Sequence, residues 1–113
     1  DLQATGTVSD AGGNVRSLPV NLQTTSYELT ASDSGKLVKA NGDITISNTS
    51  AFGVGNMISV YNTSNSDINI TRSNTTLYMS GDSADQDRVL ATKGVCTILC
   101  VGSNEYVITG SVS

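Results

Sequence analysis

The chain has 113 residues, a formal net charge of −4, 37% hydrophobic residues and 14% charged residues. This length suits a single domain, and clustered apolar residues with a small net charge predict a folded chain rather than a disordered one. The six Lys and Arg residues are scattered, which argues against a nucleic-acid partner because phosphate contacts need clustered positive charge. No apolar stretch is long enough to span a bilayer, so we expect no membrane insertion.

The first 25 residues show little hydrophobic periodicity and contain the sole proline, Pro19. Residues 1–25 are therefore predicted to form an extended amino-terminal arm, of the kind that docks on a neighbouring subunit. Residues 26–113 are predicted to form the folded module. No linker divides the chain, so we expect a single domain overall.

Hydrophobic and polar residues alternate through most of the module, which is the pattern of β-strands that bury one face. Clusters of Gly, Asn, Asp and Ser separate these strands about every ten residues, and such residues favour turns. The sequence therefore predicts an all-β fold, either a small antiparallel β-sandwich or a jelly-roll-like barrel. The side chains expected to form its core are Ile44, Ile46, Phe52, Ile58, Val60, Ile68, Ile70, Leu77, Met79, Cys96, Ile98, Cys100 and Val107.

Two segments interrupt the alternation. Residues 31–35 are predicted to form a turn or one helical turn, with Ser32 or Asp33 as its cap. Residues 48–56 form a glycine-rich crossover that contains the only phenylalanine, Phe52, and this ring is predicted to plug the core beneath the loop.

The end of the chain has the strongest β pattern. Residues 95–101 read as a strand, residues 102–104 as a tight turn and residues 105–110 as a closing strand. In the first of these strands one face carries Cys96, Ile98 and Cys100, and the other carries Val95, Leu99 and Val101. Both faces are apolar, so both are predicted to be buried, which requires a second layer or a subunit partner.

The two cysteines, Cys96 and Cys100, lie four residues apart on one strand face, which separates them by about 13 Å. A disulfide needs Cα atoms within about 7 Å, so both are predicted to be buried free thiols. The chain has no histidine, and a cysteine nucleophile or a zinc site would ordinarily need one. We expect no catalytic residues, no metal, no cofactor and no enzymatic activity.

Hard oxygen ligands gather in one acidic loop, residues 81–88, which contains Asp82, Asp85 and Asp87. Three carboxylates at this spacing could hold a calcium ion, but the pattern lacks the glycine and terminal glutamate of an EF-hand loop. A pair of carboxylates could also serve glycoside hydrolysis, although that chemistry needs a cleft lined with aromatic rings. The interpretation we favour is a solvated loop in which Arg88 pairs with one carboxylate.

The order of several segments resembles small β-rich modules of tailed-bacteriophage virion proteins. The similarity covers most of the chain, through residues 13–19, 27–37, 52–62, 67–71, 77–81, 88–94 and 105–110. Its theme is a Tyr-x-Leu-x-x-x-Asp-x-Gly-Lys segment, a small-residue crossover and an aromatic-Val-Ile-x-Gly ending. In such modules the aromatic of the ending is often tryptophan, and here it is Tyr106, which changes packing rather than class.

This resemblance implies a non-enzymatic virion structural protein, assembled in the bacterial host cytoplasm and displayed on the particle. The expected role is a capsid decoration protein, of cement or head-fibre type, or a tail-fibre module. The alternative is a carbohydrate-binding module that recognises the host at a fibre tip. The expected partners are further copies of the chain, in a homotrimer, the major capsid or tail proteins, and for the alternative role a host surface glycan.

Overall fold

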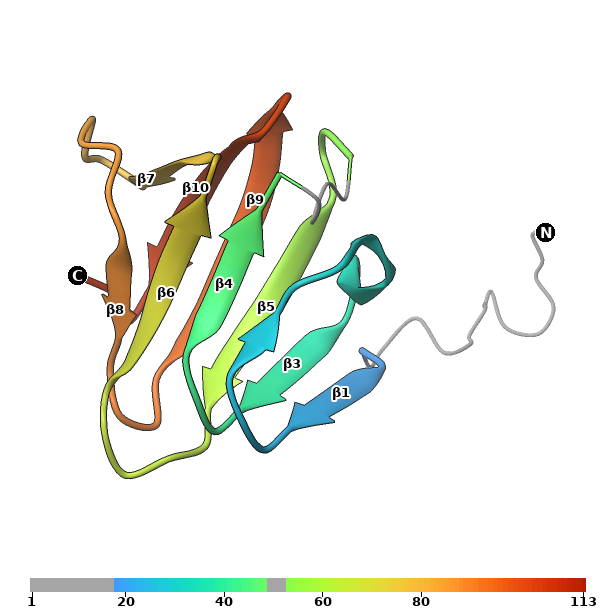
Figure 1. Cartoon of the computed structure of the whole chain (residues 1–113), viewed down its shortest axis with the longest axis vertical. Helices are drawn as coiled ribbons and strands as arrows, with labels where there is room; N and C mark the ends of the chain where they lie inside the picture. The colour runs from blue at the N-terminus through green and yellow to red at the C-terminus, as the bar shows by residue number, and fades with distance from the viewer. Residues whose placement is uncertain (1–17, 49–52) are drawn as a thin grey trace, which may run out of the picture.

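The computed structural model describes residues 18–48 and 53–113, which form two β-sheets packed face to face around one core (Figure 1). The all-β fold and the small sandwich predicted from the sequence are confirmed. Most of the predicted arm, and Phe52, lie outside the described residues. One sheet has six strands, in the order β1 (Val20–Gln23), β3 (Leu37–Ala40), β5 (Met57–Asn62), β9 (Val95–Gly102), β10 (Glu105–Gly110) and β7 (Thr76–Met79). The other has four, in the order β2 (Tyr27–Glu28), β4 (Ile44–Ser47), β6 (Ile68–Ser73) and β8 (Arg88–Leu90).

From β1 to β6 successive strands alternate between the two sheets, so the chain follows a helical path. One coil of this path consists of one strand from each sheet. Strands of one sheet stack in parallel as β1–β3–β5, and strands of the other stack as β2–β4–β6. The first two coils keep a register offset of 17 residues in both sheets, because Val20 lies opposite Leu37 and Tyr27 lies opposite Ile44. The sheets are therefore mixed rather than wholly antiparallel.

The chain closes the stack with antiparallel pairs. Strand β9 lies between β5 and β10 and runs antiparallel to both, while β8 runs antiparallel to β6. The β9–β10 hairpin is the one predicted from residues 95–110, and its turn residue Asn104 has a φ of 53°, which asparagine tolerates well. Residues 111–113 return to β8, where Leu90 lies opposite Val112.

The core between the sheets is built from alternate residues of the strands, as predicted. Of the thirteen predicted core residues, ten are buried, namely Ile44, Ile46, Ile58, Val60, Ile68, Ile70, Leu77, Cys96, Ile98 and Cys100. Met79 is partly buried against this core. Val107 was assigned to the wrong face: Tyr106 and Ile108 are buried in its place, because a register shift beside Glu105 sets Tyr106 opposite Cys100.

Within one copy of the chain, strand β9 buries one face and not both, so the predicted burial of its second face by a subunit partner stays a prediction. Val95 is 50% exposed and Val101 is 41% exposed, while Cys96, Ile98 and Cys100 are buried. The four-stranded sheet covers only the inner side of the six-stranded sheet. The outer side of the six-stranded sheet has no covering layer among the described residues, and Val95 and Val101 lie on that side.

The end of the stack at β1 and β2 is closed by a polar network. Asp33 ends a 3-10 turn, η1 (Ala31–Asp33), and is 1% exposed. Its carboxylate accepts hydrogen bonds from the Thr30 amide at 2.9 Å, the Tyr27 hydroxyl at 2.7 Å and the Asn21 side chain at 2.8 Å. The predicted helical turn is thus present, with Thr30 as its N-cap rather than Ser32 or Asp33.

The same network predicts a loss of stability in acid. Burial alone raises the pKa of Asp33, but the hydrogen bonds from Thr30, Tyr27 and Asn21 outweigh it and hold the pKa below its usual range. A depressed pKa stabilises the fold above the unfolded-state value of about 3.9, and this contribution is lost as pH falls through the folded-state value. We expect the urea midpoint of the native chain to fall below about pH 4 more steeply than that of Asp33→Asn. Parallel pH profiles of the two proteins would contradict this.

Candidate functional site

The acidic loop uses its carboxylates to hold its own shape. Asp82 accepts hydrogen bonds from the Ala84 amide at 3.0 Å and from the Arg88 guanidinium at 3.2 Å, which confirms the predicted pairing of Arg88 with one carboxylate. Asp85 accepts from the Leu77 amide at 2.9 Å and pairs with Arg72 at 2.9 Å. These hydrogen bonds lower the pKa of both carboxyl groups. The Ala84 amide has the largest effect on Asp82, and the Leu77 amide has the largest effect on Asp85.

The third carboxylate is used in the same way. Asp87 accepts hydrogen bonds from the Arg72 amide at 3.0 Å and from its side chain at 3.2 Å. Two arginines from β6 and β8 thus clamp the loop, whereas the sequence indicated one. In residues 18–48 and 53–113 no three His, Cys, Asp or Glu side chains come together as metal ligands.

Arg88 is a buried cation beneath this loop. Its side chain is 1% exposed, and it donates hydrogen bonds to Asp82 and to the Ala84 carbonyl. Its Nε atom is buried without a hydrogen-bond partner. Arginine is rarely buried completely unless it is paired, so Arg88 has a structural role at this end of the core.

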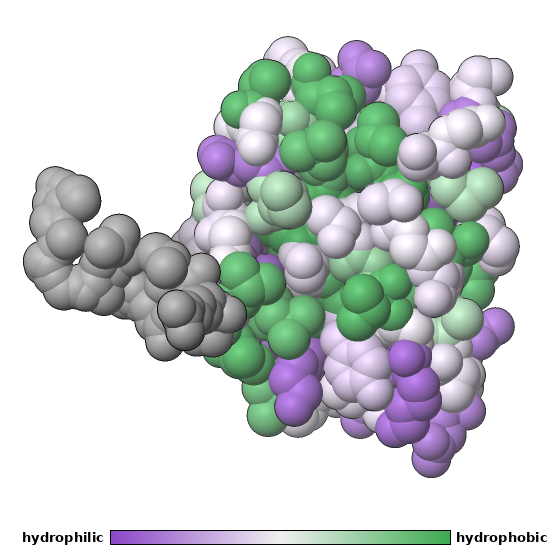
Figure 2. Space-filling model, turned by 180° about the vertical axis from the view of Figure 1, so that it is seen from behind, coloured by the Kyte–Doolittle hydropathy of each residue, from purple (hydrophilic) through white to green (hydrophobic). Residues whose placement is uncertain are grey.

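The outer face of the six-stranded sheet is the main exposed apolar surface of the described residues. It presents the outward side chains of the six strands, and Figure 2 looks onto it from behind: green apolar groups spread over the face, and purple groups lie mainly around its margin. Seven large hydrophobic side chains of the described residues are 41–69% exposed, and all lie on this face or beside it: Leu18, Val20, Leu22, Val54, Met57, Val95 and Val101.

The outer face of the four-stranded sheet is different in kind. Its outward positions include Glu28, Thr45, Asn69 and Thr71, and Thr45 and Thr71 bond to each other through their hydroxyl groups at 3.1 Å. The molecule therefore has one polar broad face and one apolar broad face. The apolar side chains of that face are interspersed with Ser59, Thr97 and Thr109, and exposed apolar patches of this kind often mark interaction sites.

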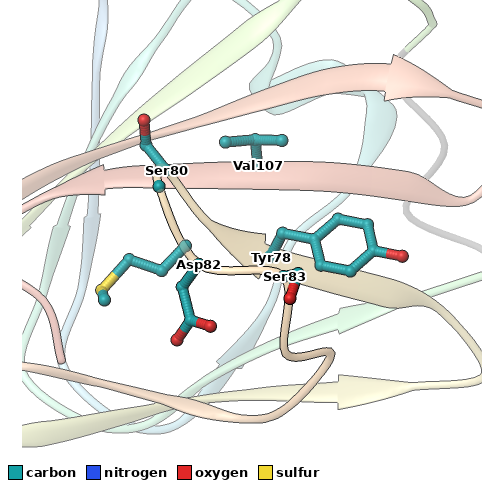
Figure 3. A pocket seen from close by; sticks show the side chains of 7 residues that line it. Tyr78, Ser80, Asp82, Ser83 and Val107 are labelled. Atoms are coloured by element: carbon teal, nitrogen blue, oxygen red, sulfur yellow. The ribbon is translucent and has the colours of Figure 1, made fainter.

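A shallow pocket lies where the apolar face meets the acidic loop. Its volume is about 410 Å³, and it is lined by Tyr78, Met79, Ser80, Gly81, Asp82, Ser83 and Val107. Figure 3 shows Tyr78 and Val107 on the neighbouring strands β7 and β10, with the Asp82 carboxylate and the Ser83 hydroxyl in the loop that follows. An aromatic ring, a carboxylate and hydroxyl groups are groups that contact sugars.

The sequence located this pocket only in part. Asp82 was singled out because it belongs to the acidic loop. Tyr78, Ser80 and Ser83 were missed, although the alternation of Leu77, Tyr78 and Met79 did place Tyr78 on the opposite face from the core. The pocket forms because β7 pairs with β10, a contact between distant parts of the chain that no local pattern marks.

Cys96 and Cys100 are buried free thiols, as predicted. Burial raises the pKa of Cys96 to about 12, so its thiol stays protonated near neutral pH. We expect neither cysteine to react with a thiol reagent at pH 8 in the folded protein, and both to react once urea unfolds it. Rapid labelling of the folded protein, followed by mass spectrometry, would contradict this burial.

A comparison of the chain with protein-family models, with curated proteins and with solved structures gives no match. Within the described part of the chain, no helix has the length and apolar character needed to cross a membrane. The candidate site therefore rests on the geometry of the apolar face and of the pocket at its edge.

Proposed function

We propose that the chain is a non-enzymatic structural module of a tailed-bacteriophage virion. It is displayed on the particle as a capsid decoration protein, of cement or head-fibre type, or as part of a tail fibre, and it works as a homo-oligomer. The observation that carries this proposal is the apolar outer face of the six-stranded sheet. The resemblance of residues 27–37 and 105–110 to small virion modules supplies the context.

The physical reason is that this face needs a partner. Val20 is 57% exposed, Leu22 62% and Met57 49%, and burying such side chains stabilises an assembly by about 25 cal/mol per Å² of apolar surface. Interfaces are also depleted in charged residues and enriched in Tyr and Met, and this face carries Tyr61, Tyr78 and Met57. The carboxylates of the acidic loop, in contrast, are already engaged by Arg72, Arg88 and backbone amides.

The test is rebinding to particles. Purified protein should sediment with phage particles or tails that lack this chain, and Leu22→Glu should weaken this binding at least tenfold. Asn69→Glu, which places the same charge on the polar face, is the control and should bind normally. A native protein that sediments with no virion component would refute the structural role.

The pocket favours a second function, the carbohydrate-binding module of a fibre tip. Tyr78 offers a ring on which a sugar can stack, and Asp82, Ser80 and Ser83 offer groups that can hydrogen-bond to sugar hydroxyls. The Asp82 carboxylate is already ionised and fixed by Ala84 and Arg88, so it is ready to accept such bonds.

A glycan test separates this function from the first. Retention on polysaccharide from a host cell surface should be saturable and should be lost in Tyr78→Ala. Tyr61→Ala, which removes a ring from the same sheet face outside the pocket, is the matched control. No retention on any host polysaccharide would rule out the sugar-binding role and would leave the structural role untouched.

A further inference from the structure

We propose that the outer face of the six-stranded sheet packs against the same face of a second copy of this chain, across a two-fold axis. This inference rests on the proposed structural role and names the partner of the apolar face. The argument comes from the relief of the face, its charge and its area.

Two neighbouring rows of outward side chains run across the strands. The first row contains Gly35, Met57, Leu99, Val107 and Tyr78, which lie side by side on β3, β5, β9, β10 and β7 or directly beside them. The second row, one outward position further along each strand, contains Leu37, Ser59, Thr97, Thr109 and Ser80.

The two rows have opposite relief at β3, β5, β9 and β7, whereas at β10 Val107 and Thr109 are similar in size. Where the first row has a large side chain, as at Met57 and Leu99, the second has a small one, as at Ser59 and Thr97. Where the first row has no side chain, at Gly35, the second has Leu37. On β5, β9 and β7 the first row therefore forms a ridge and the second row forms a groove. On β3 the large side chain is in the second row instead.

Consider a two-fold axis that lies in the plane of contact, perpendicular to the strands and midway between the two rows. This axis packs the first row of one copy against the second row of its partner. Met57 then meets Ser59 of the second copy, Leu99 meets Thr97, and Leu37 meets Gly35. Because a two-fold interface brings the same patch of both copies together, the patch must be complementary to itself, and these rows meet that condition. Two twisted sheets pack face to face in this aligned manner in sandwiches.

Charge and area agree with this partner. Neither row contains a charged side chain, so the rows of two copies meet without repulsion, although the face also carries Lys39 on β3 and each chain has a net charge of −4. Six strands about 4.8 Å apart and about five residues long give a face of about 500 Å². Two such faces bury about 1,000 Å², which is the lower limit for a specific interface. We therefore expect a reversible dimer rather than a permanent one.

The first experiment measures mass against concentration by sedimentation equilibrium. The native chain should approach twice the chain mass, and Met57→Glu should raise the dissociation constant at least tenfold. Asn69→Glu on the polar face should leave it unchanged. Circular dichroism and a urea midpoint check that each variant is folded.

A second variant separates the ridge-and-groove contact from general stickiness. Ser59→Phe makes the face more apolar but fills the groove that receives Met57 of the partner, so it should weaken the dimer. Tighter association of Ser59→Phe would overturn the proposal. So would a native chain that stays monomeric at all concentrations, or one that forms the trimer expected from the sequence.

Covalent trapping gives an independent readout. Ser59→Cys should form a covalent dimer with a short bismaleimide, whereas Asn69→Cys should not, since the native cysteines are buried. Equal cross-linking of the two variants would contradict the proposed face. A monomer that still binds virion particles would refute the dimer alone, and a dimer that binds none would refute the structural role alone.

Discussion

Gly110→Ala is expected to destabilise the fold by about 3 kcal/mol, through overpacking and backbone strain. Gly110 ends β10 with a φ of 124°, a conformation that residues with a side chain rarely adopt. A Cβ atom there would lie 2.4 Å from the Val95 carbonyl oxygen and 2.7 Å from the Cys96 Cα atom. Both obstacles are backbone atoms of β9, so they cannot move aside without breaking the β9–β10 pairing.

Gly55→Ala is the matched control for this prediction. Gly55 also has a positive φ, of 91°, but no atom lies within 4 Å of the place of its Cβ. This variant should therefore lose only about 1 kcal/mol, the cost of the left-handed conformation. Urea unfolding of both variants measures the difference. Equal losses would show that conformation, and not the close approach of β9, determines the need for glycine at residue 110.

Arg88→Ala is expected to destabilise the fold by about 3 kcal/mol, because it removes a large and fully buried side chain from the end of the core. The arginine side chain is 1% exposed and fills the end of the core beneath the acidic loop. Its loss leaves a cavity there and frees the Ala84 carbonyl. We also expect the loop to become more accessible, which limited proteolysis around residues 82–87 would detect.

Two further variants separate packing from charge. Arg88→Met keeps most of the buried volume and should recover much of the stability, since a long and flexible apolar side chain can fill the space that the arginine occupies. Arg72→Ala removes the other arginine of the loop, whose pairs with Asp85 and Asp87 are solvent-accessible. Its effect should be much smaller, as for exposed salt bridges in general. A loss in Arg72→Ala as large as in Arg88→Ala would contradict the distinction.

The strands of this fold could be predicted from the sequence because alternation is a local signal. Ile44 and Ile46, or Ile68 and Ile70, identify a buried face without any knowledge of the neighbours. The pairing could not be predicted, because β1 and β3 stack at a regular offset without similar sequences: inward positions are Asn21 in β1 and Val38 in β3. The backbone of these strands repeats at a fixed offset, whereas their amino-acid sequences do not repeat.

Positions with apolar residues on both sides of a strand were the hardest to assign. Residues 106–108 are Tyr, Val and Ile, so either register buries an apolar face, and the hairpin beside Glu105 decides between them. Residues 62–66, Asn-Thr-Ser-Asn-Ser, have the composition of a turn, but they include a residue with a structural role. Asn62 is fully buried and donates hydrogen bonds to the Ser66, Leu90 and Ala91 carbonyls. Tertiary contacts, not composition, give this asparagine its role.

The candidate site, like the fold, could be predicted only in part. The sequence indicated that residues 95–101 need a covering partner, and the exposure of Val95 and Val101 on an uncovered face keeps that need in place. It did not indicate the relief of the face, since Met57 and Ser59 acquire their neighbours Leu99 and Thr97 only when β5 pairs with β9.

The coiled path of β1 to β6 has a consequence for how such a chain can change in length. Each coil contacts mainly the coil before it and the coil after it, as in solenoid proteins, where stability is close to a sum over units and their junctions. Inserting or removing one complete 17-residue coil would shift the polar network around Asp33 along the stack and would leave the β9–β10 hairpin undisturbed. The end of the stack that could gain or lose a coil is therefore separate from β5, β9 and β10, so a lineage could vary its height while that part of the contact surface stays the same.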